Sequence, residues 1–122
     1  MFRGTGPPPP PTSPVTGTFS CTHTEGTFRA VATNVSEKRP FGDYKVSLLE
    51  VPSNAKLVTK AIVHKFYLGG NSNVSLFFDD NDDDGNLSVG DDFWVGSFRT
   101  GPYDVTIYWA SNDAVVTTVR CT

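Results

Sequence analysis

The strongest constraint on this chain is a repeated two-residue alternation of apolar and polar side chains from Val15 onward. The run Tyr44–Leu48 places Tyr, Val and Leu on one face, and the runs 74–78 and 103–109 repeat the pattern. Alternation of this period is typical of strands with one buried and one solvated face, as in two packed antiparallel sheets. The sequence therefore predicts an all-β fold, an immunoglobulin-like antiparallel two-sheet sandwich of about seven to eight strands.

The expected strands are separated by clusters of Gly, Pro, Asn, Ser and Asp. They are placed at residues 16–24, 27–35, 44–51, 60–68, 74–79, 93–99, 103–109 and 114–121. No segment is typical of a helix of three turns. Residues 53–64 contain helix formers, but Pro52 before them and the β-branched residues after them favour a turn and a strand.

Size and composition fit one folded domain. The chain has 122 residues, of which 38% are hydrophobic and 12% aromatic, enough for one core and too many for wholesale disorder. No apolar run approaches the roughly 20 residues that cross a bilayer, so we expect no membrane span. Thirteen acidic residues outweigh ten basic ones, giving a formal net charge of −3, which argues against a nucleic-acid partner.

Residues 1–17 differ in composition from the rest of the chain. They hold six of the nine prolines, including the unbroken run Pro7–Pro11, and such a run favours a stiff polyproline II rod. No apolar stretch follows Arg3, so the segment is not typical of a signal peptide. We expect an extended arm or linker at 1–17, followed by a β-sandwich domain at 18–122.

The chain has two cysteines, Cys21 and Cys121. Their spacing fits neither a metal site nor a C-x-x-C redox motif. Cys21 lies in the first expected strand and Cys121 in the last, so a disulfide between them would close a loop of about 100 residues. The sequence predicts this disulfide and with it an oxidising compartment, and two buried free thiols are the alternative.

Acidic residues are concentrated in one short segment. Seven of the thirteen lie within fourteen residues, and these are Asp79, Asp80, Asp82, Asp83, Asp84, Asp91 and Asp92. The rest of the chain carries ten positive and six negative charges, so this segment alone makes the protein acidic. Without a cation these carboxylates would repel one another, which directs attention to metal binding.

Residues 80–91 have the spacing of a calcium-binding loop. The predicted ligands, at positions 1, 3, 5, 7, 9 and 12 of the loop, are Asp80, Asp82, Asp84, Asn86 (through its carbonyl), Ser88 and Asp91. Gly85 allows the backbone to reverse, and Leu87 is expected to anchor the loop to the core. The flanks are strands, so the predicted Ca²⁺ is structural and does not drive a sensor switch. A solvated acidic turn is the alternative.

The stretch Phe77–Val95 joins a D-x-D-x-D-G loop to L-S-x-G-D and an aromatic strand. It resembles the calcium-loop β-sandwich domains of archaeal surface filament proteins, the type IV pilin-like and archaellin-like subunits. The strands expected at 103–109 and 114–121 are similar to the closing hairpin of such domains. The resemblance covers mainly residues 74–121 and implies a filament subunit. It departs at the N-terminus, where a Pro-rich arm stands in place of the long hydrophobic helix of those subunits.

Three N-x-S/T sequons occur, and Asn34 and Asn73 are the predicted glycosylation sites. The third, at Asn86, lies inside the predicted calcium loop. His23 and His64 lack metal-ligand spacing, and we expect both to serve in packing or on the surface.

The chain contains no nucleophile elbow, glycine-rich phosphate loop or H-E-x-x-H motif, so we expect no enzyme. Tyr67, Phe93 and Tyr108 are candidate exposed aromatic residues, for which edge or subunit packing is expected above sugar stacking.

Two functional hypotheses follow. The first is a structural subunit of an extracellular filament, pilus or surface assembly, whose partner is a second copy of itself, reached by the N-terminal arm. The second is a monomeric secreted immunoglobulin-like adhesin or carbohydrate-binding module on a Pro-rich linker, with a glycan as its ligand. A viral or phage surface domain remains a third hypothesis. All three place the protein outside the cell or at the cell surface.

Overall fold

The computed structural model describes residues 16–24, 27–51, 53–71, 74–97 and 102–122. Within these ranges almost every element is a strand, and a single-turn 3-10 segment, η1 (Phe41–Asp43), is the exception. The strands are β1 (Gly17–Thr24), β2 (Thr27–Val35), β3 (Arg39–Pro40), β4 (Tyr44–Glu50), β5 (Ala55–Ile62), β6 (Phe66–Gly70), β7 (Val74–Asp79), β8 (Asn86–Leu87), β9 (Asp92–Ser97), β10 (Tyr103–Trp109) and β11 (Ala114–Cys121).

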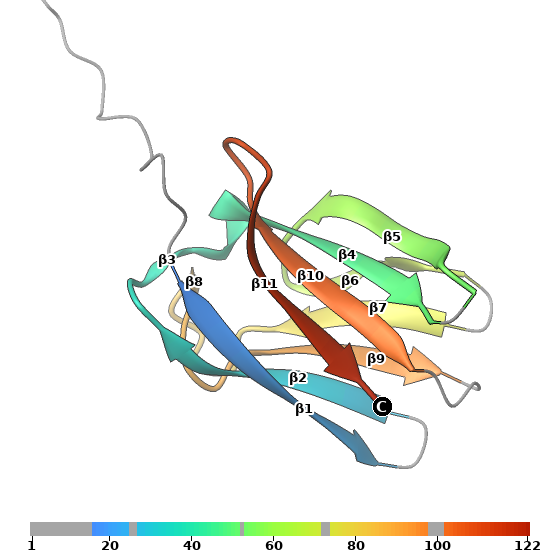
Figure 1. Cartoon of the computed structure of the whole chain (residues 1–122). Coiled ribbons are helices and arrows are strands. Elements are labelled where there is room, and N and C mark those ends of the chain that lie inside the picture. The colour runs from blue at the N-terminus through green and yellow to red at the C-terminus, as the bar shows by residue number, and fades with distance from the viewer. Residues whose placement is uncertain (1–15, 25–26, 52, 72–73, 98–101) are drawn as a thin grey trace, which may run out of the picture.

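The strands form two layers that face each other (Figure 1). Among the described residues, one sheet has the order β1-β2-β9-β7-β6, the other has the order β11-β10-β4-β5, and β3 pairs with β8. All neighbouring strands are antiparallel. Strands A, B, C, C′, D, E, F and G of an immunoglobulin domain correspond in chain order to β1, β2, β4, β5, β7, β9, β10 and β11. β6 is an additional strand beside β7. The expected immunoglobulin-like sandwich is confirmed.

The core lies between the two sheets and is built from the alternating positions. Tyr44, Val46 and Leu48 of β4 are fully buried, and the inward positions of β7 and β10 repeat the pattern. The Tyr44 ring meets Trp109 edge to face, with ring centroids 5.4 Å apart. The predicted alternation therefore marks the core correctly.

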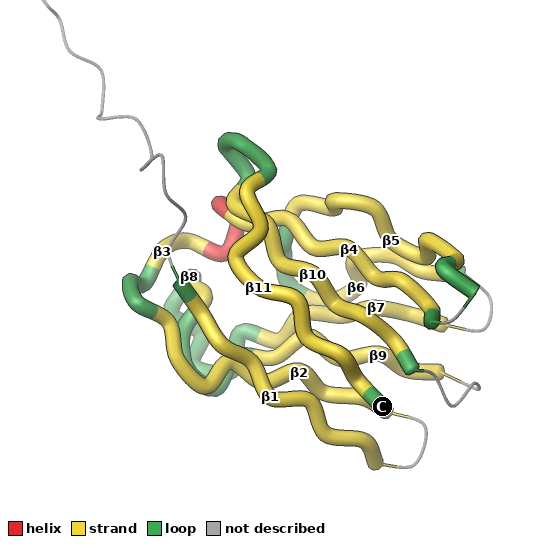
Figure 2. The backbone as a smooth tube through the Cα atoms, viewed as in Figure 1, coloured by secondary structure: helices red, strands yellow, loops and turns green. Residues whose placement is uncertain are grey.

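The strand expected at 60–68 is wrong, because this segment supplies two strands in different sheets (Figure 2). β5 belongs to the sheet of β4, whereas β6 pairs with β7 in the opposite sheet. Between them Val63 is buried, and its N–H donates to the Tyr44 carbonyl. Phe66 has a φ of 72°, which turns the chain into the second sheet. No glycine or proline stands at this turn, so the sequence gives no sign of it.

The predicted disulfide is present. Cys21 on β1 and Cys121 on β11 have their sulfur atoms 2.05 Å apart and their Cα atoms 5.3 Å apart. β1 and β11 are edge strands of opposite sheets and lie side by side, so the bond joins the two layers at one edge (Figure 1). The alternative of two free thiols is excluded.

Of the expected arm at 1–17, residues 1–15 lie outside the described residues. Thr16 continues the pairing of β1 with β2, because the Ser36 N–H donates to the Thr16 carbonyl at 2.8 Å and the Thr16 N–H donates to the Ser36 hydroxyl oxygen at 2.9 Å. In the part of the chain that the structure describes, no helix is long and apolar enough to cross a membrane.

Candidate metal centre

The acidic loop connects two neighbouring strands of the five-stranded sheet. β7 and β9 are paired in register up to Asp79 and Asp92, so residues 80–91 form the connection between them. Within it Leu87 is buried in the core, as expected, and the short strand β8 pairs with β3. The loop is therefore held by a strand at each end and by an apolar anchor in its middle.

Positive backbone angles let this loop reverse sharply. Asp83, Gly85 and Gly90 have φ values of 52°, 79° and 96°. The Asp83 N–H donates to the Asp80 carbonyl at 3.1 Å, which closes the first turn. As a result, alternate side chains of the loop point to one concave side, as the calcium-loop spacing predicts.

Four carboxylates meet on that side of the loop. Asp80, Asp82, Asp84 and Asp91 each offer one oxygen, and these oxygens lie within 4.8 Å of one another. The Asp91 side chain is fully buried, Asp80 is partly buried, and Asp82 and Asp84 are exposed. The structure thus brings together all four predicted carboxylate ligands.

Asp91 forms the base of the cluster. Its Oδ1 accepts from the Asn81 N–H at 2.9 Å, and its Oδ2 accepts from the Ser88 N–H at 2.9 Å. The buried Ser88 hydroxyl lies 2.8 Å from Asp82 Oδ2 and 3.2 Å from Asp91 Oδ2, so it can donate its proton to either carboxylate. This places the Ser88 oxygen against two of the carboxylates, where its predicted ligand role requires it.

Asp80 and Asp84 are oriented by the backbone of the turn. Asp80 Oδ2 accepts from the Gly85 N–H at 2.9 Å, and Asp84 Oδ1 accepts from the Asn86 N–H at 2.9 Å. The other oxygen of Asp80, Oδ1, is buried and has no hydrogen-bond partner among the described residues. A buried carboxylate oxygen without a donor is costly unless a cation supplies the charge.

Only one of the four carboxylates of the cluster, Asp84, has a basic partner among the described residues. Among the described residues, no Lys or Arg nitrogen lies within 4.0 Å of Asp80, Asp82 or Asp91, whereas Lys65 pairs with Asp83 and Lys38 with Asp84. Burial raises the pKa of Asp80 and Asp91 above the ordinary value. The Ser88 hydroxyl holds the pKa of Asp82 below its ordinary value.

The donor set is chemically uniform. All the predicted side-chain ligands are carboxylate or hydroxyl oxygens, the donors that the hard cation Ca²⁺ prefers, and six to eight of them at about 2.3–2.6 Å complete its coordination. Asn86 lies in β8, where its predicted role as a carbonyl ligand stays a prediction. The residues present therefore fit a calcium ion, with the solvated acidic turn as the alternative to be tested.

Sequence reasoning missed Asn81. Besides its backbone bond to Asp91, its side-chain amide donates to the Gly90 carbonyl at 2.8 Å and to Asp92 Oδ2 at 3.4 Å. It occupies position 2 of the loop, where the calcium-loop pattern specifies no residue type, so the spacing carried no signal for it. Its contacts close the loop by joining the first residues to the last.

The other predicted residues lie outside this centre. Asn34 is exposed on β2, whereas Asn73 lies outside the described residues. His23 stacks on Phe28 with ring centroids 4.0 Å apart, as expected of a packing residue. Phe93 is not exposed as expected but fully buried, because it faces inward between the outward Asp92 and Trp94.

In comparisons with known proteins, no family model, no curated protein and no solved structure matches the chain. The resemblance to archaeal filament subunits therefore stays a prediction. What the protein does has to be argued from its own residues.

Proposed function

We propose that this protein is a structural subunit of an extracellular filament, pilus or surface assembly, stabilised by Ca²⁺ in the loop of residues 80–91. The observation that carries the calcium site is the cluster of four carboxylates with a buried, unpartnered Asp80 oxygen. The proposal assigns no enzyme activity and no nucleic-acid partner to the chain.

The way in which the loop is held supports a structural ion. Gly90 and Asp91 exchange backbone hydrogen bonds of 2.9 Å with Ala32 on β2, and the Phe41 N–H donates to the Gly85 carbonyl at 3.2 Å. A loop joined to two other segments has no freedom to open as the helices of a sensor EF-hand do. A bound ion would instead brace the end of the sandwich at which β1 begins.

Three considerations support a place outside the cell. The Cys21–Cys121 disulfide is typical of proteins that fold in an oxidising compartment. Extracellular calcium is abundant enough to fill a loop of modest affinity, with stabilisation following from mass action. The sequon at Asn34 on β2 is exposed and therefore accessible to a glycan.

Thermal unfolding with Ca²⁺, with Mg²⁺ and with EDTA tests the metal centre, and light scattering on the same samples tests assembly. We expect Ca²⁺ to raise the melting temperature well above the value in EDTA, Mg²⁺ to have a smaller effect, and particles to grow beyond 13.2 kDa with concentration. Equal melting temperatures in Ca²⁺ and EDTA would reject the calcium site. A monomer at every concentration would reject the subunit role.

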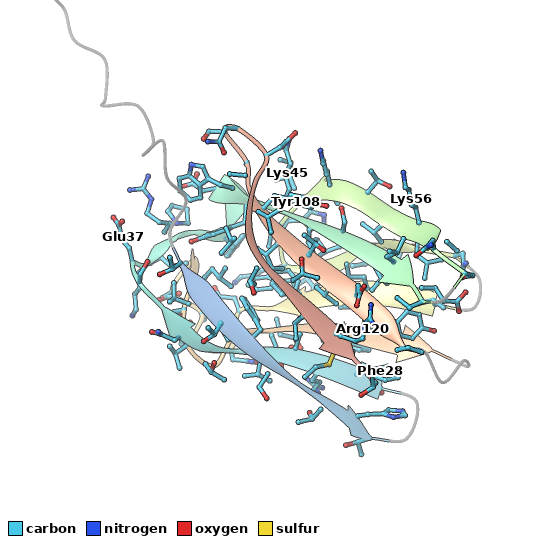
Figure 3. All side chains as sticks on the ribbon, in the orientation of Figure 1. Phe28, Glu37, Lys45, Lys56, Tyr108 and Arg120 are labelled. Carbon is cyan, nitrogen blue, oxygen red and sulfur yellow. A yellow bond between two sulfur atoms is a disulfide. The ribbon has the colours of Figure 1, made fainter. Side chains whose placement is uncertain are left out.

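A hollow of about 250 Å³ on the outer face of the four-stranded sheet favours the second candidate, a carbohydrate-binding module. Tyr108 on β10 and Lys56 on β5 both line this hollow (Figure 3), together with Ser47 and Thr106. Ring faces and hydroxyl groups of this kind suit a sugar. However, the Lys60 ammonium lies over the Tyr108 ring, 5.4 Å from its centre, so a sugar would have to displace it from the ring face.

The polar groups of this hollow are also partly engaged. Asp104 accepts two hydrogen bonds from Arg120, at 2.8 and 3.0 Å, and Ser47 Oγ accepts from the Lys60 N–H at 2.8 Å. We therefore rank this candidate second. Saturation-transfer NMR with a panel of monosaccharides tests it, and a signal lost in Tyr108→Ala would favour it over the structural role.

A further inference from the structure

The outer face of the five-stranded sheet carries a straight row of large side chains. Tyr67 on β6 pairs with Phe77 on β7, Phe77 with Trp94 on β9, and Trp94 with Arg29 on β2. These four residues, here named the aromatic row, cross four adjacent strands (Figure 1). They lie on the outer face because their neighbours along each central strand are buried in the core.

The rings of the aromatic row contact one another. Phe77 and Trp94 stack with centroids 4.1 Å apart, Tyr67 meets Phe77 edge to face at 5.6 Å, and the Arg29 guanidinium lies 5.7 Å from the Trp94 ring. Tyr67 is 51% exposed. A contiguous aromatic surface outside the core is typical of a binding face.

We propose that the aromatic row binds the proline run Pro7–Pro11 of a second copy of this chain. The inference rests on the proposed subunit function and specifies the contact between copies. Proline-rich polyproline II segments bind surfaces lined by aromatic residues, and they lose little conformational entropy because they are already extended. The chain contains both such a segment and such a surface.

The dimensions of the two partners agree. Five residues of polyproline II span about 15 Å, and three strand spacings, from Tyr67 to Arg29, span about 14 Å. Polyproline II repeats every three residues, about 9.3 Å, while Tyr67 and Trp94 are two strand spacings, about 9.6 Å, apart. Prolines three apart in the run, such as Pro7 and Pro10, would therefore face Tyr67 and Trp94 in turn.

Even when fully extended, the link from the same copy's fold would leave its proline run about 2 Å short of the row. Thr16 is hydrogen-bonded to Ser36, which fixes the point where the arm leaves the fold. The near end of the row is Arg29, which pairs with Thr22, six residues after Thr16. Six residues of strand separate these points by about 20 Å. The five links from Pro11 to Thr16 reach at most about 18 Å even when fully extended. A neighbouring copy has no such limit, and a contact of this head-to-tail kind produces an open filament.

Charge also favours this occupant. The first seventeen residues contain one charged side chain, Arg3, and no acidic residue. Asp79 and Asp92 lie beside the row and pair with its Arg29 at 3.7 and 2.8 Å, and the acidic loop follows Asp79. A segment with one positive and no negative charge is therefore not repelled by this side of the sandwich, and the acidic loop attracts it.

The test uses the full-length chain with Pro7–Pro11 replaced by serine, so that its own arm does not compete. A peptide of residues 4–14 is titrated while the two tryptophan indole N–H signals are followed by NMR, and Trp109, buried in the core, is the internal control. We expect the peptide to shift the Trp94 signal and not the Trp109 signal. A peptide with serine in place of the five prolines should shift neither.

Tyr67→Ala supplies the surface variant, and Phe66→Ala is its matched control. Phe66 is 70% exposed but pairs with the inward-facing Phe78, so it lies off the row. We expect Tyr67→Ala to weaken peptide binding about tenfold, as for an exposed aromatic anchor, and Phe66→Ala to change it less than twofold. Melting curves of both variants confirm that each is folded.

Several results would overturn the inference. One is an unmoved Trp94 signal at millimolar peptide, and another is a Trp94 shift caused by an oligosaccharide but not by the peptide. The third is a difference in the Trp94 signal between the dilute, monomeric wild-type chain and the serine variant. Such a difference would show that the arm of the same copy occupies the row.

Light scattering separates this inference from the proposed function. Particles that still form in both the serine variant and Tyr67→Ala would overturn the inference and leave the subunit role intact. A wild-type chain that remains monomeric with Ca²⁺ would reject the subunit role, and the peptide titration alone would then decide whether the row binds the proline run.

Discussion

Asp91 is the residue on which the metal centre depends most. Its side chain is fully buried, and it accepts the Asn81 and Ser88 N–H groups. Asp91→Ala leaves these donors unpaired, so we expect the metal-free protein to lose about 3 kcal/mol of unfolding free energy in urea. The same variant should lose the stabilisation by Ca²⁺.

Asp83→Asn is the control for this prediction. The Asp83 side chain is 81% exposed and pairs with Lys65 on the surface, and asparagine tolerates its positive φ. We expect a loss below about 0.5 kcal/mol and an unchanged response to Ca²⁺. If the two variants behaved alike, the acidic segment would be a solvated turn.

Asp113 gives a prediction on pH that does not involve the metal centre. Its hydrogen bond from Lys45, at 3.0 Å, holds its pKa below the ordinary value. The pair therefore contributes stability that is complete above the unfolded pKa, near 3.9, and is lost as pH falls through the lower folded value.

Asp113→Asn tests this, because asparagine accepts the φ of 58°. We expect the melting temperatures of wild type and variant to differ at pH 7 and to converge as pH falls below the unfolded pKa. A difference that is constant with pH would contradict the assigned cause.

At the residue level, the spacing of the acidic residues identified the four clustered carboxylates but not the side chain that holds their loop closed. The positions of Asp80, Asp82, Asp84 and Asp91 follow from the loop pattern, because alternate residues on a tight turn share a side. Asn81 could not be identified, since its contacts with Gly90 and Asp92 depend on how the loop closes. The aromatic row was equally hidden, because cross-strand neighbours are set by register and not by sequence distance.

Among the elements, the β6–β7 connection has the tightest backbone contact of the described glycines. A Cβ on Gly70 would lie 2.1 Å from the Val74 carbonyl oxygen, and its φ of 140° is unfavourable for other residues. We expect Gly70→Ala to reduce the unfolding free energy by about 3 kcal/mol or more, measured by urea denaturation, because backbone on both sides must shift.

Gly42 provides the comparison. A Cβ at this position meets nothing within 4 Å, and its φ is ordinary. Gly42→Ala should therefore change the unfolding free energy by well under about 1 kcal/mol. Equal losses in the two variants would show that the close contact at Gly70 is not what limits substitution.

The elements show where alternation is a sufficient guide and where it fails. β4, β7 and β10 were predictable within a residue because each has one buried and one outward face. The segment 55–70 was not, because the crossing from β5 to β6 uses buried Val63 and a positive φ at Phe66 in place of turn residues. Without turn residues between them, the end of β5 and the start of β6 have the sequence pattern of one strand.

For the whole molecule, the sequence was sufficient to predict two sheets and the bond between the terminal strands, but not the strand order. Alternation shows that a strand has a buried face and does not show which sheet it joins. The disulfide followed because Cys21 falls on a partly buried position of β1 and Cys121 on a buried one of β11.

Removing the disulfide is the prediction at this scale. It spans 100 residues of chain, for which the chain-entropy treatment gives about 4.7 kcal/mol. We expect the double variant Cys21→Ser and Cys121→Ser to lose about 4–5 kcal/mol of unfolding free energy, measured by urea denaturation in Ca²⁺. A loss below about 1 kcal/mol would mean that packing between β1 and β11 holds this edge unaided.

The same bond determines how the molecule carries tension. A pull applied between the arm and Thr122 enters the fold through β1 and leaves it from the residue after Cys121, so the covalent path runs from Cys21 directly to Cys121. The 99 residues between them, with most of the core and the acidic loop, lie outside that path. A pull between these two ends would therefore be borne by the disulfide, and the segment that it bypasses would carry no tension along its backbone.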